Sequence, residues 1–527
     1  MRKTLLLIAV CFVVILAGLS DSSGQNPADF SLESQQRARM VLEASIKSFG
    51  GIDAVRRARN FSMKNSGISY NHFQDETPKT TGFEAWKLER TIVYQTDKKR
   101  LYHDRKVTDA NSPYVWQARQ VIRNGEGFDI IVGENWVMKM RDPSLEQYRD
   151  ILQLLPQNII SDAWERTATL RSLGEATVEG KKQNVVFTRL STGQMLNLFF
   201  DAETHLLTKV DSFFTANVQG DTVTEIYFRG YRKLEGTMIP ASRFGYQNKI
   251  PRYENIYADV KLDPQVDDRL FELSPVLIKL DIAEAKASVI KMGDGVYLLR
   301  SLVGGFNVMF VEFKDFVLAV EPVEENVVNG ISSETVAAIK KTIPNKPIKY
   351  IVPTHHHSDH SAGVRAFLAE GATIITTKGN VDYFDRVAKA KFTFAPDLYA
   401  KNPIPYQVRI VENNKMVISD ETQTVEIHQF APLTHVTEML LVYLPKQKIL
   451  YQSDMFNPID VAAKAIPEDD PWHGINPVNT VNLFETLRKL GLDVDRIAGS
   501  HGRIATMQEF LQASEIIKAG KGKPGKP

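Results

Sequence analysis

The stretch Ile348-Lys-Tyr-Ile-Val-Pro-Thr-His-His-His-Ser-Asp-His-Ser-Ala-Gly363 decides the fold. Its first part is an apolar run typical of a buried strand, and a helical pattern of apolar residues begins after its final glycine. The loop between them has the spacing His-x-His-x-Asp-His. Because alternate residues of an extended segment project to one side, His355 and His357 can share one metal ion. Asp359 and His360, at the turn into the helix, are positioned to bind a second metal ion. Imidazole and carboxylate together suit zinc or a similar divalent ion.

Three further candidates lie downstream at the ends of predicted strands. His435 precedes the apolar run 439–444, and Asp454 follows the return strand, so a hairpin brings both residues to the same end. His501 follows another short strand and is flanked by glycines that allow close backbone approach. Each residue alone would more often be a core or surface residue than a ligand. Their shared placement at strand ends favours one common site.

The residue pattern around this stretch divides the chain in two. Residues 60–275 carry short runs rich in Val, Ile, Tyr, Phe and Thr between polar turns, which favours a mostly antiparallel sheet, with a helical insertion at 145–166. From residue 287 onward, strands alternate with helices, which is α/β character. We therefore expect a two-domain protein that combines α+β and α/β character. The expected parts are a signal peptide at 1–24, a helix plus antiparallel β-rich domain at 25–275, a linker at 276–287, an α/β domain at 288–515 and a disordered tail at 516–527.

The N-terminus has the three-part layout of a secretory signal peptide. Arg2 and Lys3 precede fifteen mainly apolar residues, 5–19, and small polar residues follow. This run is shorter than the ~20 residues that a transmembrane helix needs. We therefore expect an exported protein, periplasmic or secreted. An uncleaved N-terminal anchor is the alternative, and it is the one route to membrane association that the sequence offers.

The composition excludes several classes of protein. The 527 residues include 64 Lys+Arg and 63 Asp+Glu, so the net charge is +1, and no nucleic-acid partner is expected. A hydrophobic content of 43% excludes a largely disordered chain. The single cysteine, Cys11, excludes a disulfide scaffold and a Cys-rich zinc site. Any metal must therefore be held by His, Asp or Glu. The oligomeric state is left open.

Residues 288–510 resemble the metallo-β-lactamase superfamily. The resemblance is carried by the His-x-His-x-Asp-His loop, the opening hairpin pattern at 289–298 and the run 371–376 after the first helix. It implies an αββα sandwich with a binuclear metal site of two zinc ions per chain, or of iron or manganese. By the resemblance, one metal is bound by His355, His357 and His435, the other by Asp359, His360 and His501, and Asp454 bridges the two.

The chain departs from the family pattern at two positions, and two of its ligand positions distinguish between branches of the family. Glu321 stands where the family has Asp, which is expected to alter loop support, and Val436 replaces Thr beside the third ligand. His357 occupies the position where flavodiiron proteins carry Glu, which argues against oxygen or nitric-oxide redox chemistry. Asp454 stands where true β-lactamases have Cys or Ser, so antibiotic degradation is disfavoured.

The resemblance implies a metal-dependent hydrolase. In this reading a metal-bound hydroxide, oriented in part by Asp359, attacks an ester, thioester, lactone or phosphodiester. The substrate is expected to be a small molecule or an acyl- or lipid-like compound. His473 lies on the long segment where relatives place substrate loops, and is a candidate substrate contact. His356 is expected outside the ligand set, and His428 on a strand surface.

The alternative is a lipid- or ligand-binding envelope protein with a secondary or vestigial metal site. It rests on phrases such as Leu270-Phe-Glu-Leu-Ser-Pro275, through which residues 60–275 resemble the curved half-barrel domains of lipoprotein carriers. A vestigial site should have lost ligands, whereas here all seven positions are filled.

Overall fold

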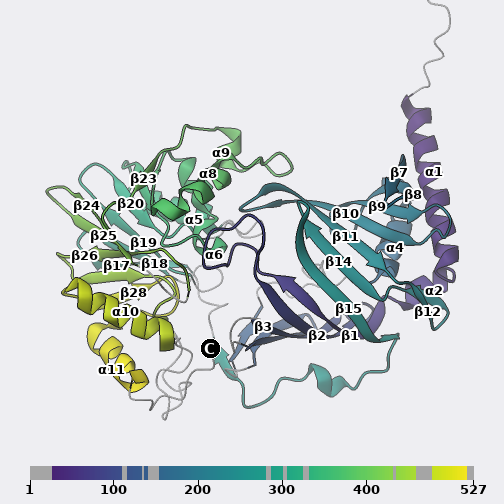
Figure 1. Cartoon of the computed structure of the whole chain (residues 1–527), viewed down its shortest axis with the longest axis horizontal. Helices are drawn as coiled ribbons and strands as arrows, with labels where there is room; N and C mark the ends of the chain where they lie inside the picture. Colours follow the sequence, from purple (N-terminus) through teal and green to yellow (C-terminus); the bar gives the residue numbers. More distant parts are fainter. Residues whose placement is uncertain are drawn as a thin grey trace, which may run out of the picture.

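The computed structural model shows two domains joined along the chain (Figure 1). The expected signal peptide at 1–24, His473 and most of the expected tail lie outside the described residues. The structure describes residues 27–109, 115–132, 136–140, 153–280, 287–300, 306–323, 331–430, 435–458 and 477–518.

The N-terminal domain is built on one large sheet. Among the described residues it has fourteen strands, in the order β16-β6-β5-β4-β3-β2-β1-β15-β14-β11-β10-β9-β8-β7. Neighbours are antiparallel except β16 and β6. The strands are β1 (Asn60–Tyr70), β2 (Ala85–Gln95), β3 (Arg100–Asp109), β4 (Val115–Arg123), β5 (Glu126–Ile131), β6 (Trp136–Lys139), β7 (Arg171–Val178), β8 (Lys181–Arg189), β9 (Met195–Asp201), β10 (Leu207–Ala216), β11 (Gly220–Arg229), β14 (Ser242–Gln247), β15 (Ile250–Leu262) and β16 (Ile278–Leu280). Strand β16 falls within the expected linker 276–287, so part of that segment belongs to this sheet.

In the described part of the N-terminal domain, three helices cover one face of this sheet. Helix α1 buries Ala38, Leu42 and Ile46, which are spaced four residues apart and so share one side of the helix. They pack with residues of α4 and of strands β8 to β11 in one core. The helices are α1 (Pro27–Ser48), α2 (Ile52–Arg57) and α4 (Pro156–Glu165), with 3₁₀ turns at Thr167–Thr169 and Asp268–Phe271; β12 (Arg232–Leu234) and β13 (Thr237–Ile239) form a separate pair. The antiparallel β-rich domain is confirmed, and the half-barrel resemblance stays a prediction.

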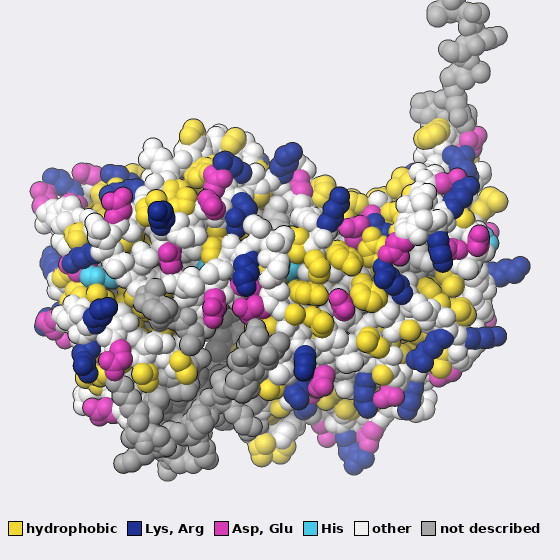
Figure 2. Space-filling model, in the orientation of Figure 1, with side chains coloured by type: hydrophobic (Ala, Val, Ile, Leu, Met, Phe, Trp, Pro, Cys, Tyr) yellow, Lys and Arg dark blue, Asp and Glu magenta, His cyan; other side chains and the backbone are white. Residues whose placement is uncertain are grey.

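The other face of the sheet is partly apolar. Figure 2 shows hydrophobic side chains gathered over β11, β14 and β15. Ile256 on β15 is exposed, and Tyr227 on β11 packs edge-on against Tyr246 on β14. In the described part of the chain, none of the helices combines the length and apolar character needed to cross a bilayer.

The C-terminal domain is a four-layer sandwich of helices, two sheets and helices. The first sheet has the order β17 to β23 and the second the order β24 to β29. The strands are β17 (Ser288–Gly293), β18 (Val296–Arg300), β19 (Val308–Glu312), β20 (Val317–Val320), β21 (Ile348–Val352), β22 (Thr373–Thr376), β23 (Val408–Ile410), β24 (Lys415–Ser419), β25 (Thr424–Phe430), β26 (Met439–Leu444), β27 (Ile449–Gln452), β28 (Arg496–Gly499) and β29 (Ala505–Thr506). The helices are α5 (Ile331–Thr342), α6 (Ser358–Ser361), α7 (Val364–Leu368), α8 (Val381–Lys389), α9 (Leu398–Lys401), α10 (Pro477–Leu490) and α11 (Met507–Lys518), with a 3₁₀ turn at Lys378–Asn380. The expected αββα architecture is confirmed.

Strand β26 shows why two layers of helices are needed. All six of its residues are buried. Leu440, Val442 and Leu444 join the core between the two sheets, whereas Met439, Leu441 and Tyr443 pack in a second core with α10 and α11. Because alternate side chains of a strand point to opposite faces, an apolar residue at every position requires cover on both sides.

Within the described ranges, two segments of the N-terminal domain contact the C-terminal domain. One is the loop between β1 and β2, residues 71–84, which lies beside α6 (Figure 1). The other is the turn between β10 and β11 together with the first residues of β11. There, the Asp221 carboxylate accepts hydrogen bonds from the backbone N–H of Thr393 (2.7 Å) and of Phe394 (3.0 Å). Gly220 has a φ of 70°, and a Cβ at this position would lie 2.1 Å from the carbonyl oxygen of Lys391, so the close approach requires glycine.

Candidate metal centre

The strand–loop–helix unit of the deciding stretch forms as predicted. Strand β21 ends at Val352, and α6 begins at Ser358. The loop between them carries His355 and His357, and His360 lies in α6. All three imidazoles are buried, because the loop sits at the carboxyl edge of the first sheet with the second sheet packed against it.

The seven predicted ligands come together in two groups. Within each group, one potential ligand atom per residue lies within 4.8 Å of all the others. Strands β21, β26, β27 and β28 bring them to one end of the sandwich, because each ligand lies next to the end of one of these strands. The first group is His355, His357, His435 and Asp454, and the second is Asp359, His360 and His501.

Asp454 lies between the two groups. Its Oδ2 is 3.1 Å from Nε2 of His435 in the first group and 3.0 Å from Nε2 of His360 in the second. Its Oδ1 is 3.3 Å from Nε2 of His501. One carboxylate therefore faces both groups, which is the placement that a bridging ligand requires.

The carboxylate of Glu321 supports both groups from behind. Its Oε1 accepts a short hydrogen bond from Nδ1 of His360, and it also accepts one from Oγ1 of Thr354 (3.3 Å). Thr354 Oγ1 in turn lies 3.0 Å from Nδ1 of His355. Ser453 donates to the same oxygen at 3.2 Å. Glu321 is fully buried and has a φ of 79°, a backbone strain that these bonds help to hold.

The donor set fits a divalent metal pair. His355 and His360 contact Thr354 and Glu321 through Nδ1, which leaves Nε2 of both rings facing the site. Nε2 of His360 is buried and makes no hydrogen bond, although it lies 3.1 Å from Oδ2 of Asp359. His357 donates from Nε2 to the carbonyl oxygen of Asp75 at 3.1 Å, which leaves its Nδ1 for the metal. A hydrogen bond from the other ring nitrogen, which fixes the orientation of the imidazole, is typical of metal-ligating histidines.

The surroundings shift the pKa of one ligand imidazole and of two ligand carboxylates. Burial and the neighbouring imidazoles of His360 and His357 hold the pKa of His355 well below its usual value, so this ring is neutral and able to ligate. Burial opposes ionisation of Asp454, but the surrounding histidines, His360 first, hold its pKa well below the usual range. The same balance, with a hydrogen bond from Gln74, lowers the pKa of Asp359.

The predicted ligands differ in their exposure to solvent. The side chains of Asp359, His501 and His435 are 33%, 29% and 24% exposed, whereas those of His355 and His360 are fully buried. Phe306 packs against the ring of His501, with 4.5 Å between centroids. Among the described residues, these partly exposed ligands are therefore the ones that a substrate can reach from solvent.

Two predictions about other histidines are settled by the structure. His428 was expected on a strand surface, and this is wrong, because the ring is buried on β25 and bonds to Glu426 at 2.9 Å. Its strand is covered by the neighbouring layers, which an alternating pattern read alone does not reveal. His356 is outside both ligand groups, as expected, and its Nε2 donates to the carbonyl oxygen of Asp75 at 2.9 Å.

The contacts from residues 71–84 to the ligands were missed by the sequence analysis. Gln74 donates from Nε2 to Oδ1 of Asp359 at 2.8 Å, and the carbonyl of Asp75 accepts from two histidines of the metal loop. These residues lie more than 280 positions from their partners along the chain. No local spacing could have signalled them.

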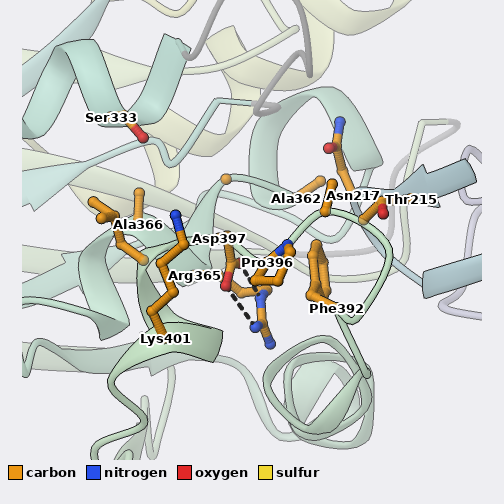
Figure 3. Close-up of a pocket in the computed structure, with 13 residues that line it drawn as sticks. Thr215, Asn217, Ser333, Ala362, Arg365, Ala366, Phe392, Pro396, Asp397 and Lys401 are labelled. Carbon is orange, nitrogen blue, oxygen red and sulfur yellow. Dashed lines mark hydrogen bonds and ion pairs between the residues drawn. The ribbon is translucent and has the colours of Figure 1, made fainter. Parts of the chain in front are cut away.

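A cavity of about 270 Å³ lies away from this centre, between the β10–β11 turn and the helices α7 and α9 (Figure 3). Arg365 on its wall is already paired with Asp397, through bonds of 2.6 and 3.0 Å, and stacks on Phe392. None of the seven predicted ligands lines it. Arg365 and Asp397 satisfy one another, so this arginine is explained by packing at the second interdomain contact.

A family comparison supports the assignment of the C-terminal domain, and several solved structures are similar to part of the chain. The sequence model of the family described as "Metallo-beta-lactamase superfamily" matches residues 319–501. A metallo-β-lactamase from Pontibacter korlensis is 18% identical with a TM-score of 0.31, over 44% of this chain and 99% of that chain. One from Hirschia baltica is 20% identical with a TM-score of 0.30, over 44% and 98%. A flavodiiron protein from Giardia intestinalis is 16% identical with a TM-score of 0.33, over 45% and 60%. A search of curated proteins gave no match.

The family match spans the segment that carries the whole predicted ligand set together with Glu321. That segment carries most of the helix–sheet–sheet–helix sandwich described above. The C-terminal domain belongs to the metallo-β-lactamase superfamily.

Proposed function

We propose that this chain is an exported hydrolase that uses two zinc ions to cleave an ester, thioester, lactone or phosphodiester. The observation that carries the proposal is the pair of ligand groups that share Asp454. The first group would hold one ion through three imidazoles, and the second group would hold the other. When bound, the two ions would supply a nucleophile at neutral pH by acidifying water and would polarise the oxygen of the scissile group.

The protein's own groups have separate tasks in this reaction. Asp359 is ionised and partly exposed, so its carboxylate can accept a hydrogen bond from an attacking water and orient it. Glu321 holds the rings of His360 and, through Thr354, of His355. Asp454, which is ionised between the two groups, would offset the repulsion between two cations.

The test begins with the metal content of the purified full-length chain. We expect two zinc ions per chain, and hydrolysis of at least one member of a panel of esters, thioesters, lactones and bis-phosphodiesters. Activity should be lost on chelation and return with zinc. The variant His355→Ala should lose metal and activity together, whereas Glu426→Gln, which changes a carboxylate on β25 outside both groups, should keep both. A chain with two metals that cleaves no panel member would contradict the proposed reaction.

Export is part of this proposal and rests on the N-terminal sequence. Fractionation of producing cells, with N-terminal sequencing of the mature protein, tests it directly. Recovery of soluble cytoplasmic protein that retains Met1 would contradict it.

A second candidate function is binding of a lipid or other apolar ligand by the N-terminal domain. It is favoured by the apolar side chains on the open face of the sheet, including exposed Ile256 and Met195. Binding of a fluorescent fatty acid by the full-length chain would support this candidate if Ile256→Lys abolished binding and His355→Ala did not. Hydrolysis that depends on the metals would still assign the catalytic role to the C-terminal domain.

A further inference from the structure

The loop of residues 71–84 belongs to the N-terminal domain but is hydrogen-bonded to two of the ligand-bearing segments of the C-terminal domain. The backbone N–H of Ser358 donates to the carbonyl oxygen of Phe73 at 3.1 Å, and that of Thr437 donates to the carbonyl oxygen of Glu76 at 2.9 Å. Ser358 and Thr437 each lie within two residues of a predicted metal ligand. The loop therefore lies directly behind the site.

Gln74 reaches from this loop to a predicted ligand itself. Its side-chain Nε2 donates to Oδ1 of Asp359 at 2.8 Å and to Oγ of Ser358 at 3.2 Å. An ionised carboxylate can only accept hydrogen bonds, so the amide nitrogen of Gln74 is the atom that must face it. The other carboxylate oxygen, Oδ2, faces Nε2 of His360 at 3.1 Å. Gln74 thus holds one oxygen of Asp359 while the second points towards the metal group.

The loop that presents Gln74 is itself held in place. The buried carboxylate of Asp75 accepts from the backbone N–H of Glu84 at 2.9 Å, which closes the loop across its base. His72 donates from Nε2 to the carbonyl oxygen of Pro251 at 2.7 Å, and its ring packs on Phe83 with 4.3 Å between centroids. A side chain on a loop fixed at both ends loses little conformational freedom when it bonds its target.

We propose that Gln74 is a positioning residue that fixes the Asp359 carboxylate for metal binding, so that the N-terminal domain completes the metal centre of the C-terminal domain. This inference rests on the proposed function, because it assigns Gln74 a role towards the same metals. Removal of such an outer partner of a ligand commonly lowers metal affinity or activity 10–100-fold. The loss should fall on the group of Asp359, His360 and His501.

The experiment compares three variants of the full-length chain. Gln74→Ala removes the side chain, and Gln74→Glu keeps its length but replaces the donor with a carboxylate facing Asp359. Thr77→Ala, at an exposed position of the same loop, is the matched control. Two zinc dissociation constants are measured by chelator competition, the absorption spectrum is recorded after substitution with cobalt, and thermal unfolding is followed for the metal-free proteins. For any panel substrate that is cleaved, kcat and KM are measured as well.

We expect Gln74→Ala to weaken the second zinc 10–100-fold, to change the cobalt spectrum, and to lower kcat more than it raises KM. Gln74→Glu should be at least as impaired, because its carboxylate repels Asp359, and Thr77→Ala should match the wild type. Wild-type zinc affinities and an unchanged cobalt spectrum in Gln74→Ala would overturn the inference. So would normal behaviour of Gln74→Glu, because the amide would then serve only to fill space.

The two proposals can fail separately. If the wild-type chain binds two metals but cleaves no substrate, the hydrolase proposal fails, while the affinities still decide the role of Gln74. If the wild type binds no second metal, both fail.

Discussion

Glu321→Gln tests whether one buried carboxylate orients a ligand in each half of the metal centre. The substitution keeps the size of the side chain and one acceptor oxygen, but removes the charge. In the wild type, Glu321 accepts from Nδ1 of His360 and from Oγ1 of Thr354, which contacts His355 in the other group. Burial raises the pKa of Glu321, and the bonds from His360 and Thr354 oppose that shift. The surroundings therefore supply the donors that an ionised form needs.

The expected loss of zinc affinity follows from the number of hydrogen bonds whose acceptor loses its charge. A hydrogen bond to a charged group contributes about 1.5–3 kcal/mol and a neutral one about 0.5–1.5 kcal/mol, so the difference is about 1–1.5 kcal/mol per bond. One affected bond serves each ligand group. Because about 1.4 kcal/mol corresponds to a tenfold change in an equilibrium constant, each zinc dissociation constant should rise about tenfold.

The assay is chelator competition on the full-length wild type, on Glu321→Gln and on the control Glu426→Gln. The control also removes a charge from a carboxylate that accepts from a histidine, His428 at 2.9 Å, but this pair lies outside both ligand groups. We expect weaker binding of both ions in the first variant and unchanged affinities in the control. Zinc affinities within twofold of the wild type in Glu321→Gln would refute the reasoning, and a loss confined to one ion would show that Thr354 does not transmit the effect to His355.

Three further predictions concern the bridge, the pH dependence and the domain contact. Asp454→Ala should release the ion of the Asp359 group first, because the other group keeps three imidazoles; metal analysis that still finds two ions per chain would contradict a bridging role. Burial lowers the pKa of His72 to about 4, so between pH 6.5 and 4 the unfolded chain binds a proton that the folded chain does not. The free energy of unfolding therefore decreases as the pH decreases through this range. In urea titrations, the wild type should lose about 1 kcal/mol more unfolding free energy between pH 7 and pH 5 than His72→Gln, after a discount for solvent screening. Parallel plots of unfolding free energy against pH for the two proteins would count against this assignment. Asp221→Ala removes the acceptor for two backbone N–H groups of the other domain, and should lower the unfolding free energy by about 1–3 kcal/mol without changing zinc affinity. An unchanged denaturation midpoint would show that this contact does not stabilise docking.

The sequence by itself determined the residue types of the metal centre and the layout of the domain around it. Metal binding demands imidazole and carboxylate, and the strand–loop–helix context of His355, His357, Asp359 and His360 dictates which side chains share a side. Strand ends at one edge of a sandwich are close in space, which is why His435 could be placed from a pattern alone. The change from alternating runs to strand–helix alternation likewise separated the two domains.

Only the tertiary structure decided which residues hydrogen-bond to the predicted metal ligands. Gln74 meets Asp359 across 285 positions of chain, and a contact of this kind depends on how two domains dock, which no local periodicity encodes. The same holds for His428, whose burial depends on the layer packed over its strand. Glu321 is intermediate: its place in the pattern was visible, but its bonds to both ligand groups required the two sheets to be brought together. Local spacing selects the atoms that can bind a metal, whereas packing between distant segments sets their orientation and their charge.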